Sequence, residues 1–222
     1  MPDSGLGEMR TDQLIPILAA NLLPQDRHAV LRRFCIALSV GAVAAVVALV
    51  SSLGIRPDLP GLLTTPFFWG KLAFPLLMAF AAVLVAARLA IPGASPRRGW
   101  LLLIAFYAAI WVVALAVLVA APPDTRLALL FGHTWSTCPV YIALLSVPSY
   151  LALSWAMRGL APTRLRLAGM AVGLLSGAIG TLAYILRCPE MSVPFWALWY
   201  SIGMAIPMLA GCLLARVSFR WW

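Results

Sequence analysis

The sequence has little charge of either sign. Asp, Glu, Lys and Arg make up only 10% of its 222 residues, hydrophobic residues make up 63%, and the mean hydropathy is +0.97. Soluble globular domains are only about 45–50% apolar, so this composition excludes an ordinary soluble domain and indicates an integral membrane protein. A membrane-spanning helix with its share of loop needs roughly 30–35 residues. The chain therefore has room for six or seven such helices at most, and for no large soluble domain.

Acidic residues are absent from the long apolar stretches. Most ion-coupled carriers need a carboxylate inside the membrane. The sequence also lacks the His-Glu-x-x-His and Gly-x-Ser-x-Gly motifs of metalloproteases and hydrolases. We therefore expect that the protein is not an enzyme. The seven acidic residues all lie outside these stretches, and they are Asp3, Glu8, Asp12, Asp26, Asp58, Asp124 and Glu190.

Six apolar runs predict six membrane-spanning helices. Each run is close to the length of about 20 residues that crosses a bilayer, and none alternates as a barrel strand would. The predicted fold class is therefore all-α, a polytopic membrane protein with residues 1–33 as an amino-terminal segment, 34–216 as the six-helix domain and 217–222 as a short tail. The predicted spans are Phe34 to Leu53, Phe67 to Ala87, Trp100 to Ala121, Val140 to Met157, Leu167 to Leu186 and Phe195 to Ala215.

The arginines predict the orientation of these helices. Cytoplasmic loops collect basic residues, and a cytoplasmic amino terminus leaves only Arg56, Arg126 and Arg187 outside. Both termini are therefore predicted to be cytoplasmic, and the net charge of +9 is mainly a topology signal with no need for bound nucleic acid. The twelve arginines placed inside are Arg10, Arg27, Arg32, Arg33, Arg88, Arg97, Arg98, Arg158, Arg164, Arg166, Arg216 and Arg220.

The amino-terminal segment contains a predicted amphipathic helix. Thr11 can cap its start. Such a helix either lies in the membrane surface or docks into a groove on a partner protein. Glu8, Asp12 and Asp26 suit an anionic bilayer poorly, which favours a protein partner. The apolar stripe of this helix consists of Leu14, Ile15, Ile17, Leu18 and Leu22.

Topology separates the four cysteines into two pairs. Cys35 and Cys212 fall near the cytoplasmic ends of their helices, where thiols stay reduced and pack as small apolar groups. Cys138 and Cys188 fall at outer helix ends, and each precedes a proline. Their helices are joined by a short inner loop, so the two helices are predicted to be antiparallel neighbours with both sulfurs at one level.

Three hypotheses suit this outer pair of thiols: a structural disulfide, a reversible redox switch, or a pair of ligands for a soft metal ion. A metal site needs further ligands. The nearby candidates for these are Glu190, His133 or a second subunit.

Two further features concern the helices themselves. Gly169, Gly173 and Gly177 place small residues along one face of the fifth span, which predicts close packing against another helix. Lys71 is the single charge inside a span, and its place near the outer end of the second span predicts that its side chain extends to the membrane surface.

Several motifs along the chain resemble one known family, the NrsF-type negative regulators of sigma F, which are six-helix inner-membrane anti-sigma factors of proteobacteria. The most specific part is the spaced pair of Cys-Pro and Cys-Pro-Glu, and Lys71 matches a lysine of the family. The resemblance covers nearly the whole chain. Its motifs are Thr11-Asp12-Gln13-Leu14-Ile15, Pro66-Phe67-Phe68-Trp69-Gly70-Lys71-Leu72, Cys138-Pro139, Ala161-Pro162-Thr163, Cys188-Pro189-Glu190 and Ala197-Leu198-Trp199-Tyr200.

The resemblance implies an anti-sigma factor that holds an extracytoplasmic-function sigma factor at the membrane. Cys138 and Cys188, as an exposed periplasmic pair, would sense heavy-metal or oxidative stress, with a heavy-metal ion as their only expected ligand and no other cofactor. The inner loop that carries Arg97 and Arg98 is a further candidate contact for the partner. The residues expected to bind the sigma factor are Asp12, Leu14, Ile15, Leu18 and Leu22.

Two other functions stay open at this point. A membrane thiol oxidoreductase or small carrier could use the outer cysteines, although the Cys-x-x-Cys motif common in such enzymes is absent. A structural assembly subunit is the third interpretation, because the glycine faces could also bind a membrane partner.

Overall fold

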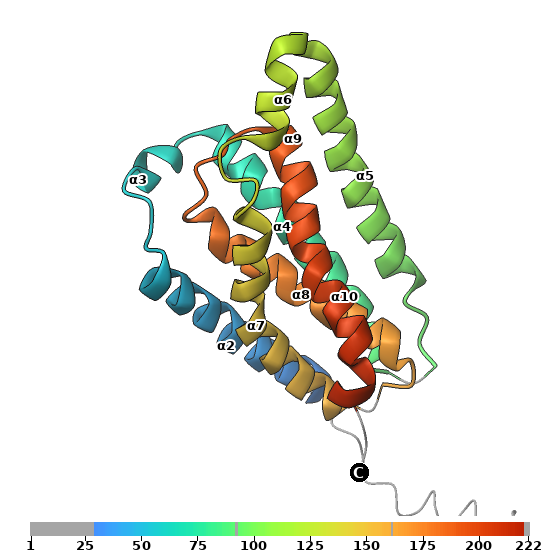
Figure 1. Cartoon of the computed structure of the whole chain (residues 1–222). Helices are drawn as coiled ribbons and strands as arrows, with labels where there is room; N and C mark the ends of the chain where they lie inside the picture. The colour runs from blue at the N-terminus through green and yellow to red at the C-terminus, as the bar shows by residue number, and fades with distance from the viewer. Residues whose placement is uncertain (1–28, 92, 161, 220–222) are drawn as a thin grey trace, which may run out of the picture.

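The computed structural model of the chain describes residues 29–91, 93–160 and 162–219, and this part is all-helical (Figure 1). The predicted fold class is confirmed, because six helices are long and apolar enough to cross a membrane. The predicted amino-terminal helix lies outside the described residues. The six spans are α2 (Ala29–Ser52), α4 (Pro66–Leu89), α5 (Arg97–Ala120), α7 (Cys138–Arg158), α8 (Leu165–Ile185) and a last span built from α9 (Val193–Phe195), η1 (Trp196–Tyr200) and α10 (Ser201–Ser218).

Three local features of the fold were not predicted from the sequence. Short helices α3 (Leu59–Leu62) and α6 (Pro123–Phe131) lie in the connections that follow α2 and α5, and the last span begins with one π-helical turn, η1. Each short helix has a proline in its first turn, where proline is tolerated. These elements gather at one end of the bundle, at the top of Figure 1, together with the loop that precedes α7. We call this end the cysteine end, because Cys138 and Cys188 lie there.

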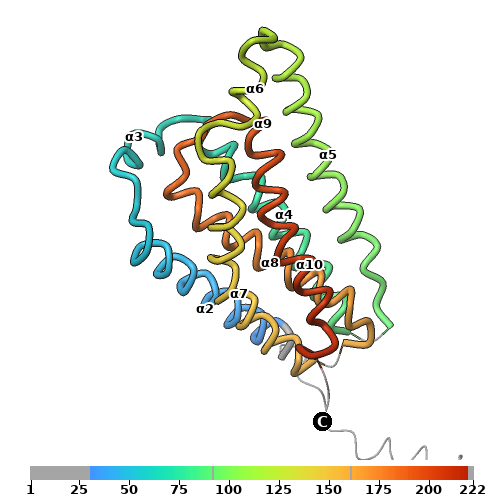
Figure 2. Tube along the Cα trace, in the orientation of Figure 1, coloured from blue at the N-terminus to red at the C-terminus, as the bar shows by residue number. Residues whose placement is uncertain are grey.

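Helix α8 forms the centre of the bundle. Almost all of its residues are buried, and it packs against α10, α7, α4 and α2. Figure 2 shows its trace enclosed by these four helices, while α5 runs along the outside. The outward faces carry large apolar side chains, such as Val119 at 76% and Leu213 at 80% exposure. Surfaces of this kind are stable in lipid and not in water.

The predicted glycine face of α8 is the contact with α10. A Cβ atom built on Gly169 would lie 2.1 Å from the carbonyl oxygen of Gly211, and one built on Gly173 would lie 2.1 Å from that of Pro207. A Cβ on Gly177 would meet Met204 at 2.9 Å. Only glycine permits two helix backbones to approach this closely, so the packing prediction is confirmed.

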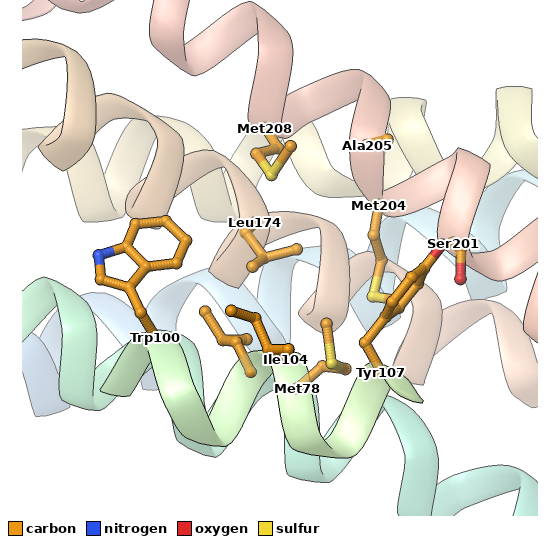
Figure 3. Close-up of a pocket in the computed structure, with 10 residues that line it drawn as sticks. Met78, Trp100, Ile104, Tyr107, Leu174, Ser201, Met204, Ala205 and Met208 are labelled. Carbon is orange, nitrogen blue, oxygen red and sulfur yellow. The ribbon is translucent and has the colours of Figure 1, made fainter. Parts of the chain in front are cut away.

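Helix α5 is the least buried span. Its first turn packs tightly on α4, and its residues from Trp100 to Tyr107 line a cavity of about 270 Å³ between α5 and α10. Figure 3 shows the lining, which is almost entirely carbon and sulfur, with Met78, Met204 and Met208 facing Trp100 and Tyr107. The lining carries no charged side chain, so this cavity is suited to hydrocarbon and offers no group for acid–base or metal chemistry.

Candidate functional site

Cys138 and Cys188 lie at the same end of the bundle, as predicted from the short connection between their helices. Cys138 is the first residue of α7, and Cys188 follows the end of α8. Both side chains belong to the buried core, and both thiols are free. The prediction of exposed thiols is wrong, because each cysteine is 0% exposed. Tyr184 and Tyr200 at the same end of the bundle are also buried.

Lys71 contributes a buried cation to this site. It is 1% exposed, and its Nζ donates hydrogen bonds to the backbone oxygens of Cys188 (2.9 Å) and Glu190 (2.7 Å). The same nitrogen lies 5.9 Å from the centre of the Tyr200 ring. The interpretation of Lys71 as a side chain that reaches the membrane surface is therefore wrong. A buried ammonium needs hydrogen-bond partners, and the loop after α8 supplies two carbonyl groups.

Arg56 brings a second cation to the same carbonyl group. Its NH1 donates to the Cys188 oxygen at 3.1 Å, and its backbone N–H donates to the oxygen of Leu186 at 3.3 Å. Asp58 holds the guanidinium with a two-pronged hydrogen bond of 2.6 and 2.5 Å. This contact lowers the pKa of the Asp58 carboxyl below its usual range and raises that of Arg56. The Arg56–Asp58 pair, which we call the arginine clasp, thus joins the segment after α2 to Cys188.

Glu190 connects the two cysteine segments. Its Oε1 accepts hydrogen bonds from the backbone N–H of His133 (2.7 Å) and the hydroxyl of Thr134 (3.4 Å), both in the loop that leads into Cys138. The backbone of Gly132 turns beside this carboxylate with φ +52, and a Cβ there would meet it at 2.5 Å. We call residues 186–192 the Cys-Pro-Glu loop. Its main chain and its glutamate together contact α4, the segment after α2 and the loop before α7.

A polar cavity lies beside the thiols. It has a volume of about 460 Å³ and is lined by the arginine clasp, Arg187, and hydroxyl groups that include those of Thr137 and Tyr184. The ring of Tyr184 stacks on that of Tyr141 with 6.1 Å between ring centres.

The predicted third metal ligand is not assembled here. His133 offers its backbone N–H to Glu190, and no group of three His, Cys, Asp or Glu side chains converges anywhere in the described residues. Two thiols alone suit disulfide formation or two-coordinate binding of a soft ion. The residues that the sequence analysis expected to bind a sigma factor, Asp12, Leu14, Ile15, Leu18 and Leu22, lie outside the described residues.

The arginine clasp and the hydrogen bonds of Lys71 were not predicted from the sequence. Arg56 and Asp58 have the spacing of a local ion pair, which was the available signal for the clasp. The acceptor of both cations is a main-chain carbonyl, which any residue type provides. The convergence of the two cations on Cys188 therefore has no signature in the sequence.

Comparison with known proteins places this geometry in context. The family model described as negative regulator of sigma F matches residues 18–221. The chain is 39% identical to the probable anti-sigma-F factor NrsF of Azospira oryzae over 213 residues, which is 96% of this chain and 100% of the relative. It is 38% identical to the anti-sigma-F factor NrsF of Caulobacter vibrioides over 214 residues, again 96% of this chain and 100% of the relative. No solved structure matches the chain.

Proposed function

This chain belongs to the NrsF family of negative regulators of sigma F, and from that premise we propose how it regulates its sigma factor. The relatives are anti-sigma factors, which are regulators rather than enzymes, so a sigma factor is the partner. We infer that this partner is of the extracytoplasmic-function type. We place the protein in the bacterial inner membrane with both termini in the cytoplasm, as the arginine distribution favours.

The amino-terminal segment is the proposed docking site. The described residues consist almost entirely of the bundle and short loops, so residues 1–28 are the longest stretch of chain that can reach a cytoplasmic partner. The apolar stripe of Leu14, Ile15, Leu18 and Leu22 suits a groove on a folded protein, and Asp12 suits a basic rim.

The two buried thiols are the proposed sensor of oxidative or heavy-metal stress. In the oxidative case the thiols of Cys138 and Cys188 together lose two protons and two electrons to an external two-electron oxidant, and one S–S bond forms. In the metal case a thiophilic ion replaces the two thiol protons and is held by both sulfurs. The observation that supports this proposal best is the bonding of Cys188. Its carbonyl oxygen accepts hydrogen bonds from Lys71 at 2.9 Å and Arg56 at 3.1 Å, so its backbone cannot move alone.

These bonds also suggest how a change at the cysteines could reach the amino-terminal segment. The arginine clasp lies just beyond the end of α2, and α2 begins at Ala29, directly after the proposed docking segment. Helix α2 also packs along α7, which starts at Cys138. Both cysteines are thus coupled to α2, the helix that follows the amino-terminal segment in the chain. A change in population from 1:99 to 99:1 needs about 5.5 kcal/mol of differential free energy, which is within the range of a new covalent or thiolate–metal bond.

The experiment compares two double variants in cells that carry a reporter of the sigma factor. Cys138→Ser with Cys188→Ser is expected to keep the sigma factor bound and to abolish induction by oxidant or heavy metal. Cys35→Ser with Cys212→Ser is the matched control, because these two thiols lie away from the cysteine end. Induction that persists in the first variant, or is lost equally in the second, would refute the sensing role.

A further inference from the structure

A group of arginines surrounds a cavity at the opposite end of the bundle. This cavity, of about 570 Å³, lies where α4 ends and α5 begins, and Arg88, Arg97 and Arg98 line it together with Ser95. Its remaining walls include Leu84 and Leu102, which belong to the membrane-spanning parts of the two helices. The cavity therefore combines a cationic rim with an apolar wall at the membrane boundary.

The packing of the two helices holds these arginines together. Gly99 is buried, and a Cβ on it would lie 2.7 Å from the Val85 side chain and 3.0 Å from its backbone nitrogen. This close approach places the first turn of α5 against the last turns of α4, so the guanidinium of Arg88 shares a cavity with those of Arg97 and Arg98. The preference for basic residues in cytoplasmic loops accounts for arginines at this end. It does not account for three of them around one cavity.

The described residues provide no anion for this group. Their carboxylates, Asp58, Asp124 and Glu190, are all at or near the cysteine end, and Arg56–Asp58 is the ion pair that they form. Three guanidinium groups around one cavity repel one another, and an anion relieves that repulsion. Guanidinium groups bind phosphate oxygens in a two-pronged geometry.

We propose that this cavity binds the phosphate group of an anionic phospholipid. The apolar wall favours a lipid over free phosphate, because Leu84 and Leu102 adjoin outward-facing apolar surface where acyl chains lie, such as Leu101 at 56% exposure. Basic pockets between transmembrane helices are a known setting for anionic headgroups. The proposal does not depend on the sigma factor or on the cysteines.

The test uses the full-length protein in detergent and native mass spectrometry. Phosphatidylglycerol is titrated against phosphatidylcholine with identical acyl chains, and inorganic phosphate is added in a separate arm. The wild type is expected to bind phosphatidylglycerol more tightly, and the variant with Arg88→Gln, Arg97→Gln and Arg98→Gln is expected to lose this preference by roughly tenfold or more. The corresponding triple lysine variant, which keeps the charge but not the two-pronged geometry, is expected to fall between them.

A control variant with equal loss of charge makes the result specific. Arg32→Gln, Arg166→Gln and Arg216→Gln change exposed arginines near the same end of the bundle that do not line the cavity, and this variant is expected to keep the preference. Equal loss in both glutamine variants would overturn the proposal in favour of general charge attraction. Displacement of the lipid by millimolar inorganic phosphate would overturn it in favour of a free-phosphate site. Unchanged lipid binding in the cavity variant, with loss of sigma-factor capture, would reassign the cavity to the protein partner.

Discussion

The close contact between α8 and α10 predicts the effect of a glycine substitution on stability. A Cβ atom on Gly173 would lie 2.1 Å from the Pro207 carbonyl oxygen, and real Cβ contacts essentially never fall below 3.0 Å. Gly173→Ala therefore requires the two helices to separate locally by about 0.9 Å. Overpacking of this kind typically costs about 1–3 kcal/mol, and the higher helix propensity of alanine returns at most about 1 kcal/mol of that. We expect a clear net loss of stability.

Gly70→Ala is the matched control for this prediction. Gly70 also lies inside a spanning helix, α4, but a Cβ there meets nothing within 4 Å. Its replacement is expected to leave stability unchanged or to raise it by up to about 1 kcal/mol. The assay is thermal unfolding in one detergent at one scan rate, followed by the fluorescence of the nine tryptophans. Gly173→Ala is expected to lower the unfolding midpoint by roughly 2–8 °C. Equal midpoints for the two variants would refute the close packing of α8 on α10.

Three further predictions concern the cysteine end. Lys71→Met removes two hydrogen bonds to the Cys-Pro-Glu loop, but it also removes the cost of burying an ammonium, so the change in global stability should be small. The rate of amide hydrogen exchange in that loop should rise roughly tenfold, which corresponds to about 1.4 kcal/mol. An unchanged exchange rate would contradict these bonds. Asp58→Asn should destabilise the protein at neutral pH. Because the clasp lowers the pKa of Asp58, the difference in stability between the variant and the wild type should vanish as the pH falls below the usual aspartate range of about 4. A difference in stability that persists at low pH would show that the charge of Asp58 is not what matters. Glu190→Ala should speed exchange in the loop before α7 while Lys71 keeps its main-chain acceptors, and protection of that loop in the variant would show that the carboxylate does not hold it.

The spans and their packing could be predicted because both depend on local sequence. A run of about 20 apolar residues identifies a membrane helix wherever it occurs, and the predicted bounds differ from those of the structure by only a few residues. The four-residue spacing of Gly169, Gly173 and Gly177 similarly marks one helix face without knowledge of the neighbour. The short loop after α7 was enough to predict that Cys138 and Cys188 lie at one end of the bundle.

The details of the site depend on contacts that the sequence does not encode locally. Lys71 and its acceptor Cys188 are 117 residues apart, and the acceptor is a backbone oxygen. The same applies to the burial of the thiols, which depends on how the helices and loops of the cysteine end pack together. Position in a hydropathy profile gives the depth of a side chain in the membrane but not whether protein or lipid surrounds it. For this reason Lys71 and the thiols were both expected to be more exposed than they are.

The proposed role of the amino-terminal segment is to hold a sigma factor at the membrane. Its most direct test is capture of soluble partners by the detergent-solubilised full-length protein, followed by mass spectrometry, for the wild type, Leu14→Asp and Leu127→Asp. Leu127 is an exposed leucine of α6 at the cysteine end, 69% accessible, and serves as the control for a new charge on an apolar site. The account predicts that a sigma factor is recovered with the wild type and Leu127→Asp and lost with Leu14→Asp. Recovery of the same sigma factor with Leu14→Asp at wild-type yield would contradict it.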